Sequence, residues 1–131
     1  MIKINKNIVN KAIETAVTSN VRRGKVAAVI YTDRGEILAT SCNTRFYREM
    51  GSGKFTIHAE EMVLSKAYKM CLTRRYNNLN MFVLRYKRET KSIAIAKPCE
   101  KCQILLKNWD FPVYYTTEYG IERLKGKIKN T

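Results

Sequence analysis

Apolar residues recur along the first third of the chain in patterns that predict one helix and two strands. From Asn5 to Thr18, apolar pairs repeat at four-residue steps, which gives an amphipathic helix one apolar face. The apolar run from Lys25 to Thr32 lies between Gly24 and an Asp33-Arg34-Gly35 turn, and it predicts a buried strand. Glu36 to Cys42 follows as the second strand of a hairpin.

The middle of the chain predicts a long loop, a helix and a third strand. Arg45 to Thr56 has no hydrophobic period and is long enough to be a functional loop. Ile57 to Leu72 has helical spacing with no internal Gly or Pro, and Arg74 to Asn80 is a polar break. Met81 to Tyr86 then predicts a strand.

The last part of the chain predicts shorter elements. Ser92 to Ala96 alternates like a short strand, and Cys99 to Asn108 has the spacing of a short helix. Pro112 to Thr116 predicts a fourth main strand. Tyr119 to Thr131 interleaves basic and apolar residues, which is compatible with an edge strand or with a basic tail.

The order of these elements predicts an α/β fold, a three-layer α/β/α sandwich with a mixed sheet of four to five strands and helices on both faces. The 131 residues predict one domain, 1–131, with a basic tail from about residue 120. A hydrophobic content of 45% excludes a disordered basic chain. With no apolar stretch long enough for a membrane span or a signal peptide, we expect no membrane partner and a cytoplasmic location, in the host cytoplasm if the protein is viral.

Basic residues strongly outnumber acidic ones. The chain has 25 Lys and Arg against 11 Asp and Glu, a formal net charge of +14. A positive surface attracts phosphates, nucleotides or nucleic acid, but it also keeps a protein soluble, so the charge alone leaves both interpretations open. The candidates for contact with a phosphate flank the first strand and the long loop: Arg22, Arg23, Lys25, Arg45, Arg48 and Lys54.

Three metal-ligating side chains lie at the starts of two predicted helices. His58, the single histidine of the chain, opens one helix, and Cys99 and Cys102 open the next. Cysteines three apart at a helix start share one face, where backbone N–H groups stabilise thiolates. Zinc sites with three protein ligands keep a fourth position for water, so this set predicts a catalytic site. A fourth ligand from Cys42 or Cys71 would instead complete a structural site.

Glu60 lies two residues after His58 and carries the second part of the prediction. The first turn of the helix can place its carboxylate beside a metal-bound water without binding the metal. Zinc lowers the pKa of such a water toward about 7, and a carboxylate within hydrogen-bond reach can pass its proton to a leaving nitrogen. We therefore expect one catalytic Zn²⁺, with Glu60 as the proton shuttle.

Two motifs, His58-Ala59-Glu60 and Pro98-Cys99-Glu100-Lys101-Cys102, resemble the signature of the cytidine deaminase-like zinc hydrolases. The stretch Arg22 to Ile30 resembles the first strand region of deoxycytidylate deaminases. The hairpin that ends at Asn43 resembles the strand that supplies their substrate-binding asparagine. Because the segment between the two motifs is longer than in compact members of the family, we interpret the charged stretch Arg85 to Lys91 as a flap that faces the substrate.

The resemblance implies the layout of a complete site. It implies zinc ligands at His58, Cys99 and Cys102, a backbone contact from Ala59 to the pyrimidine, and a hydrogen bond from Asn43 to the sugar or base. It also implies hydrolytic deamination of cytosine to uracil in a nucleoside or nucleotide, with deoxycytidylate favoured. The family further implies a homo-oligomer.

Three other functions remain open from the sequence. The basic surface also suits a cytosine deaminase that acts on single-stranded DNA or RNA. A tRNA adenosine deaminase is less favoured, because the region around Asn43 lacks the proline-rich continuation of that family. A zinc-stabilised binding protein without turnover would need the metal ligands but not Glu60.

Overall fold

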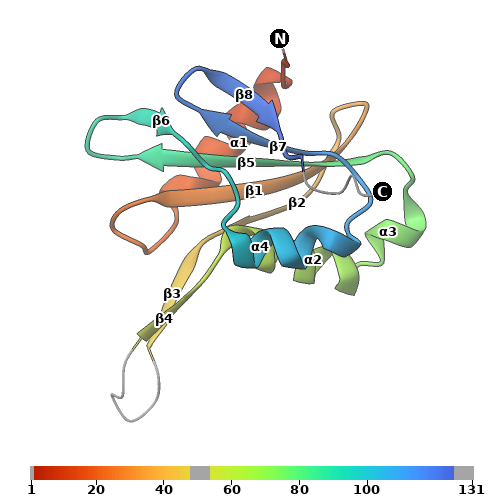
Figure 1. The fold of residues 1–131 in the computed structure, drawn as a ribbon, viewed down its shortest axis with the longest axis horizontal. Helices are drawn as coiled ribbons and strands as arrows, with labels where there is room; N and C mark the ends of the chain where they lie inside the picture. Colours follow the sequence, from red (N-terminus) through yellow and green to blue (C-terminus); the bar gives the residue numbers. More distant parts are fainter. Residues whose placement is uncertain (1, 48–53, 126–131) are drawn as a thin grey trace.

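A mixed six-stranded sheet forms the centre of the computed structural model, which describes residues 2–47 and 54–125 (Figure 1). Its strands are β1 (Lys25–Thr32), β2 (Ile37–Cys42), β5 (Leu79–Lys87), β6 (Ser92–Ala94), β7 (Val113–Thr117) and β8 (Gly120–Arg123). They lie in the order β2-β1-β5-β7-β8, and β6 pairs with β5. The β5–β7 pair is parallel and the other pairs are antiparallel.

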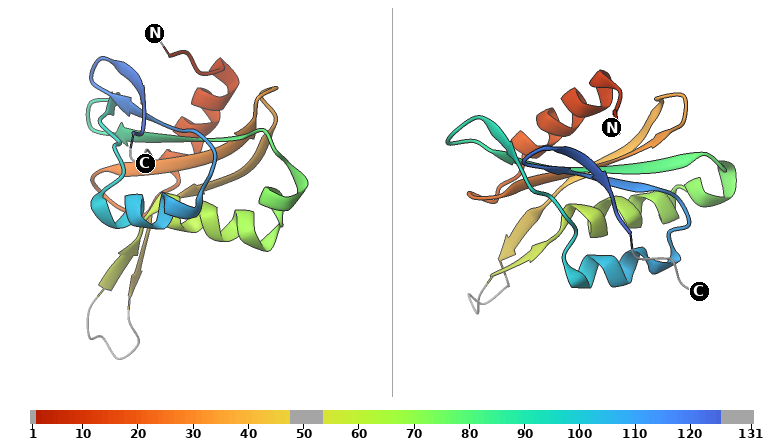
Figure 2. Two further views of the ribbon diagram at one scale, coloured as in Figure 1. Left: turned by 45° about the vertical axis from the view of Figure 1, so that its right-hand side comes forward. Right: turned by 45° about the horizontal axis from the view of Figure 1, so that its top comes forward.

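Helices cover both faces of this sheet (Figure 2). α1 (Lys6–Val17) lies on one face, and α2 (Ala59–Lys69) lies on the other beside α4 (Glu100–Leu105). The predicted three-layer α/β/α architecture is confirmed, with six strands in the main sheet in place of four to five. Among the described residues, no helix combines the length and the apolar character that a bilayer span requires.

Each face of the sheet carries its own apolar cluster. Successive residues of β1 enter opposite clusters, because strand side chains alternate between faces. The cluster beneath α1 contains Ile8, Ala12, Ala16, Ala27, Val29, Tyr31, Phe82 and Leu84. The cluster beneath α2 and α4 includes Ala28, Ile30, Val63, Leu64, Met81, Val83 and Trp109. A strand buried on both faces explains the unbroken apolar run that the sequence shows there.

A two-stranded antiparallel ribbon, β3 (Thr44–Tyr47) and β4 (Lys54–Ile57), projects from the body of the protein (Figure 1). The prediction of a loop from Arg45 to Thr56 is therefore wrong at both ends, and residues 48–53 lie outside the described part. The ribbon depends on pairing across the two segments, such as Phe46 with Phe55, which no local hydrophobic period reveals.

Two other boundaries differ from the predictions. The helix predicted to reach Leu72 ends at Lys69, and Cys71, at φ 56°, separates it from the short α3 (Leu72–Arg75). No Gly or Pro marks this break, and α3 includes Arg74 and Arg75 of the predicted polar break. At the other end of the chain, Gly120–Arg123 form β8 along the edge of the sheet, so the edge strand is the correct one of the two predicted alternatives for this segment and a tail beginning at residue 120 is wrong.

We expect the aromatic ring at the centre of the α1-side cluster to be a large contributor to stability. Phe82 is 0% exposed, so Phe82→Ala leaves a cavity and should lower the free energy of unfolding by about 3–5 kcal/mol in urea titrations. Tyr119 is 92% exposed, and Tyr119→Ala should change it by less than about 0.5 kcal/mol. Equal losses in the two variants would contradict this packing.

Candidate active site

The starts of α2 and α4 position the candidate metal ligands. His58 lies between the end of β4 and the first residue of α2, and its backbone N–H donates to the carboxylate of Glu61 at 3.2 Å. The same carboxylate lies 3.5 Å from the ammonium of Lys101, in the first turn of α4. Glu61 thus connects the two helix starts, which come from segments distant in sequence.

His58, Cys99 and Cys102 form one cluster. Nδ1 of His58 lies 3.2 Å from Sγ of Cys102 and 3.6 Å from Sγ of Cys99. Their donor atoms all lie within 4.8 Å of one another. A tetrahedral zinc ion with Zn–S of about 2.3 Å and Zn–N of about 2.0–2.1 Å separates a nitrogen and a sulfur donor by about 3.6 Å. The cluster therefore fits a zinc ion, with Nδ1 as the imidazole donor.

The chemistry of the donor set also favours a cation. Burial raises the pKa of the Cys102 thiol well above its ordinary value, and the negative charge of Glu60 acts in the same direction. A thiolate at this position therefore needs a positive charge beside it. A divalent ion bound by the sulfur supplies that charge and deprotonates the thiol.

Glu60 lies beside this cluster on the buried face of α2. Its side chain is only 5% exposed. Burial raises the pKa of the carboxyl group, whereas a backbone hydrogen bond and the nearby His58 act in the opposite direction. A carboxyl group with a raised pKa can gain and lose a proton near neutral pH, and it therefore suits proton transfer better than a carboxyl group that stays ionised.

A cavity of about 170 Å³ brings the predicted site residues together. It is lined by Val26, Asn43, His58, Ala59, Glu60, Arg85, Ile95, Ala96, Lys97 and Cys99. Two predicted metal ligands, the predicted proton shuttle and both predicted substrate contacts thus share one enclosure. It is smaller than the roughly 300–1,000 Å³ of most ligand pockets, and its volume suits a small ring.

Asn43 has a structural role as well as a place in the cavity. Its Oδ1 accepts hydrogen bonds from the Ser19 hydroxyl at 2.8 Å and the Val26 backbone N–H at 3.0 Å. Its Nδ2 donates to the carbonyl of Gly24 at 2.9 Å. An amide nitrogen carries two hydrogens. Among the described residues only Gly24 accepts from it, so the second N–H can donate to a ligand.

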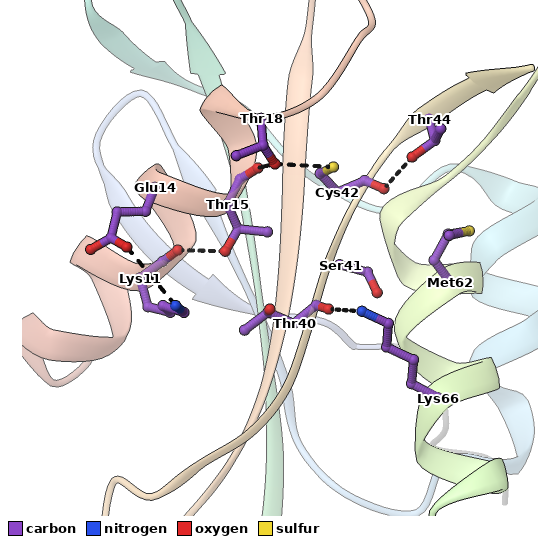
Figure 3. Close-up of a pocket in the computed structure, with 10 residues that line it drawn as sticks. All are labelled: Lys11, Glu14, Thr15, Thr18, Thr40, Ser41, Cys42, Thr44, Met62 and Lys66. Atoms are coloured by element: carbon purple, nitrogen blue, oxygen red, sulfur yellow. Dashed lines mark hydrogen bonds and ion pairs between the residues drawn. The ribbon is translucent and has the colours of Figure 1, made fainter.

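The other two cysteines lie away from the metal cluster. Cys42 lines a different cavity of about 350 Å³ between α1, β2 and α2, where its sulfur lies 3.6 Å from the Thr18 hydroxyl (Figure 3). In the same cavity Lys66 donates to the carbonyl of Thr40 at 2.6 Å. Cys71 is exposed at the end of α2. Within residues 2–47 and 54–125, the metal-ligating group contains neither of them, so the interpretation as a four-ligand structural site gains no support.

The predicted flap from Arg85 to Lys91 is wrong at its first residue, because Arg85 lies in the central sheet. Arg85 lies in β5 and lines the cavity, while Arg88 to Lys91 form an exposed turn before β6. Its charge alternates with the buried Met81 and Val83, but only the strand register, which places it opposite Val26, shows that it belongs to the cavity. Lys25, a predicted phosphate contact, is instead buried and donates to the carbonyl of Ser19. Arg48, another such candidate, lies outside the described residues.

The sequence matches the model of the cytidine and deoxycytidylate deaminase zinc-binding region over residues 2–116. The chain belongs to this family. The match covers Cys99 and Cys102, the histidine and Glu60, and it confirms the predicted resemblance to zinc-binding deaminases. No curated protein gives a significant match to the sequence.

Solved structures of cytidine deaminases share the fold. The cytidine deaminase of Burkholderia pseudomallei is similar with a TM-score of 0.61 and 15% identity, over 94% of this chain and 93% of that one. The cytidine deaminase of Mycobacterium tuberculosis is similar with a TM-score of 0.57 and 18% identity, over 92% of this chain and 91% of that one. The family fold thus persists here in a highly diverged sequence.

We expect the three clustered donors to hold the zinc. Purified wild-type protein should contain about one zinc per chain by elemental analysis, and His58→Ala or Cys102→Ser should lose most of it, because two ligands bind zinc far more weakly than three. Cys71→Ser is the matched control and should retain the metal, since Cys71 is exposed and outside the cluster. Full zinc content in both ligand variants would contradict the assignment.

Proposed function

We propose that this protein hydrolytically deaminates cytosine to uracil in a nucleoside or nucleotide, with deoxycytidylate as the favoured substrate. The observation that carries the proposal is the small cavity that joins a three-donor metal cluster to Glu60 and Asn43. Three protein ligands leave a coordination position for the reacting water, as hydrolysis requires. Membership of the deaminase family supports the same reaction.

His58, Cys99 and Cys102 would hold the zinc, which, when bound, acts as a Lewis acid and makes water a nucleophile near neutral pH. Glu60 would take a proton from the attacking water at a carboxylate oxygen and deliver it to N3 of the cytosine ring. It would then carry the second proton of the water to the exocyclic nitrogen, which leaves as ammonia while the oxygen of the water stays on the ring. The buried position of Glu60 excludes competing solvent and keeps its proton available for this transfer.

Asn43 and Ala59 orient the substrate in the proposed reaction. Hydrogen bonds with Ser19, Val26 and Gly24 hold the Asn43 amide in place. In the proposed reaction its remaining N–H donates to the sugar or base. Ala59 is 0% exposed and is the first residue of α2, where backbone N–H groups lack partners within the helix. Its small side chain lets a pyrimidine approach the backbone there.

A second candidate function is deamination of cytosine in single-stranded DNA or RNA. The β3–β4 ribbon favours it, because the ribbon begins directly after Asn43 and ends directly before His58. Its described residues include Arg45 and the exposed Phe46, and a basic and aromatic surface is typical of proteins that hold single strands. The net charge of +14 acts in the same direction.

The proposed enzyme works as a homo-oligomer in a reducing cytoplasm. Apolar side chains are exposed on α4, where Ile104 is 57% and Leu105 is 40% exposed, and contact with another copy would cover them.

All four cysteines are free, which is typical of proteins from reducing compartments.

Glu60→Gln tests the proton shuttle. The amide keeps the size of the side chain but cannot accept a proton, so kcat for deoxycytidylate should fall by about 10²–10⁴-fold while the zinc content stays the same. Glu118→Gln removes an exposed acid between β7 and β8 and should leave kcat unchanged. Undiminished turnover in Glu60→Gln would refute the role. Wild-type protein inactive on cytosine, its nucleosides, its nucleotides and a cytosine-containing oligonucleotide would refute deamination altogether.

Salt dependence separates the two candidate substrates. Binding through one nucleotide phosphate should weaken by about threefold between 50 and 200 mM salt, whereas binding of a single strand through 6–10 phosphates would weaken by about 300- to 10⁴-fold. We therefore expect a shallow salt dependence of kcat/KM for deoxycytidylate, measured by ammonia release. Turnover of a single-stranded oligonucleotide with a steep dependence, and none of deoxycytidylate, would favour the second function.

A further inference from the structure

Arg85 occupies a position in β5 where the strand pattern would place a core residue. Met81 and Val83 belong to the apolar cluster beneath α2, and Arg85 follows them on the same face of the strand. It pairs with Val26 across the β1–β5 ladder, and both residues line the candidate active-site cavity. The register of the central sheet therefore places Arg85 at the site, and the turn that follows β5 is not needed to bring it there.

Gly24 provides the surface against which this guanidinium packs. A Cβ atom at Gly24 would lie 2.9 Å from Nη2 and 3.1 Å from Nε of Arg85, so a larger residue there would displace the end of the arginine side chain. Gly24 also has φ +67°, which L residues rarely adopt. Its carbonyl accepts the hydrogen bond from Asn43. Gly24 thus contacts two cavity-lining groups, the Asn43 amide and the Arg85 guanidinium.

The charge of Arg85 lacks a counter-ion in the described part of the chain. Its Nε is buried and has no hydrogen-bond partner among the described residues. The two ion pairs found among residues 2–47 and 54–125, Lys11–Glu14 and Lys101–Glu61, do not involve it. A guanidinium stays charged at any physiological pH, and Arg85 is only partly exposed, with no carboxylate paired to it among the described residues. Such a group in a cavity is therefore suited to an anionic ligand.

We propose that Arg85 binds the phosphate of a nucleoside monophosphate and thereby selects nucleotides over nucleosides at this site. This inference rests on the proposed deaminase function. In this proposal the base occupies the cavity and the phosphate lies beside Arg85, and the exposed Lys97, which also lines the cavity, is a second cation. The planar fork of Arg85 can donate two parallel hydrogen bonds to phosphate oxygens.

The test compares deoxycytidylate with deoxycytidine in the full-length protein. Arg85→Gln should lower kcat/KM for deoxycytidylate by about 10–100-fold, mainly through KM, because charge-assisted hydrogen bonds are lost. For deoxycytidine the same variant should stay within about threefold of wild type, which also shows that it folds. Arg85→Lys should give an intermediate loss for deoxycytidylate, because lysine keeps the charge but not the fork. Arg88→Gln is the matched control, an exposed arginine of the same hairpin, and should leave both substrates unchanged.

Equal losses on the nucleotide and the nucleoside would overturn the proposal, because Arg85 would then act on the base or on the fold. A loss confined to a cytosine-containing oligonucleotide would overturn it in favour of a backbone phosphate.

Calorimetric measurement of deoxyuridylate and deoxyuridine binding tests the role of Arg85 without relying on turnover. Tighter binding of deoxyuridylate by wild type, weakened by Arg85→Gln and not by Arg88→Gln, supports the role of Arg85 even if no cytosine substrate reacts and the proposed function fails. Binding unaffected by Arg85→Gln, or no binding of deoxyuridylate at all, overturns it.

Discussion

The convergence of two helix starts on one small volume is the constraint on which the rest of the site depends. An imidazole and two thiols lie within 4.8 Å of one another, and one of the thiols is buried beside a carboxylate. Without a cation these groups gain little from proximity, since burial keeps the Cys102 thiol protonated. With a divalent ion between them, the same burial becomes favourable, because weak screening strengthens the attraction between thiolate and metal.

The register of the sheet fixes where these two helices begin. β1 and β5 are buried on both faces, so their register cannot slip without exposing one apolar cluster and disrupting the other. β5 pairs with β7 at Met81 to Val83 and with β6 from Arg85 onward, on the same edge. Arg85 lies where the partner strand changes, and the chain passes from β6 through Pro98 to the cysteines at the start of α4.

The sequence is most informative where chemistry restricts the residue types. His58, Glu60, Cys99 and Cys102 could be predicted because ligand spacing and helix starts are local features, and the alternating elements gave the three layers. The β3–β4 ribbon could not, because its pairing joins segments whose charged residues conceal any alternation. The break at Cys71 had no signal either, since a cysteine at positive φ is set by its surroundings. Arg85 is visible only once the register places it opposite Val26.

The ribbon between Asn43 and His58 has a geometric consequence for how such a site tolerates change. An antiparallel pair brings the chain back to its point of departure, so Thr44 and Ile57 remain cross-strand neighbours. Adding or removing residue pairs in the two strands would change how far the ribbon extends into solvent, while Thr44 and Ile57 would stay in place. The length of the ribbon can therefore change to suit larger or smaller ligands without moving Asn43 or His58.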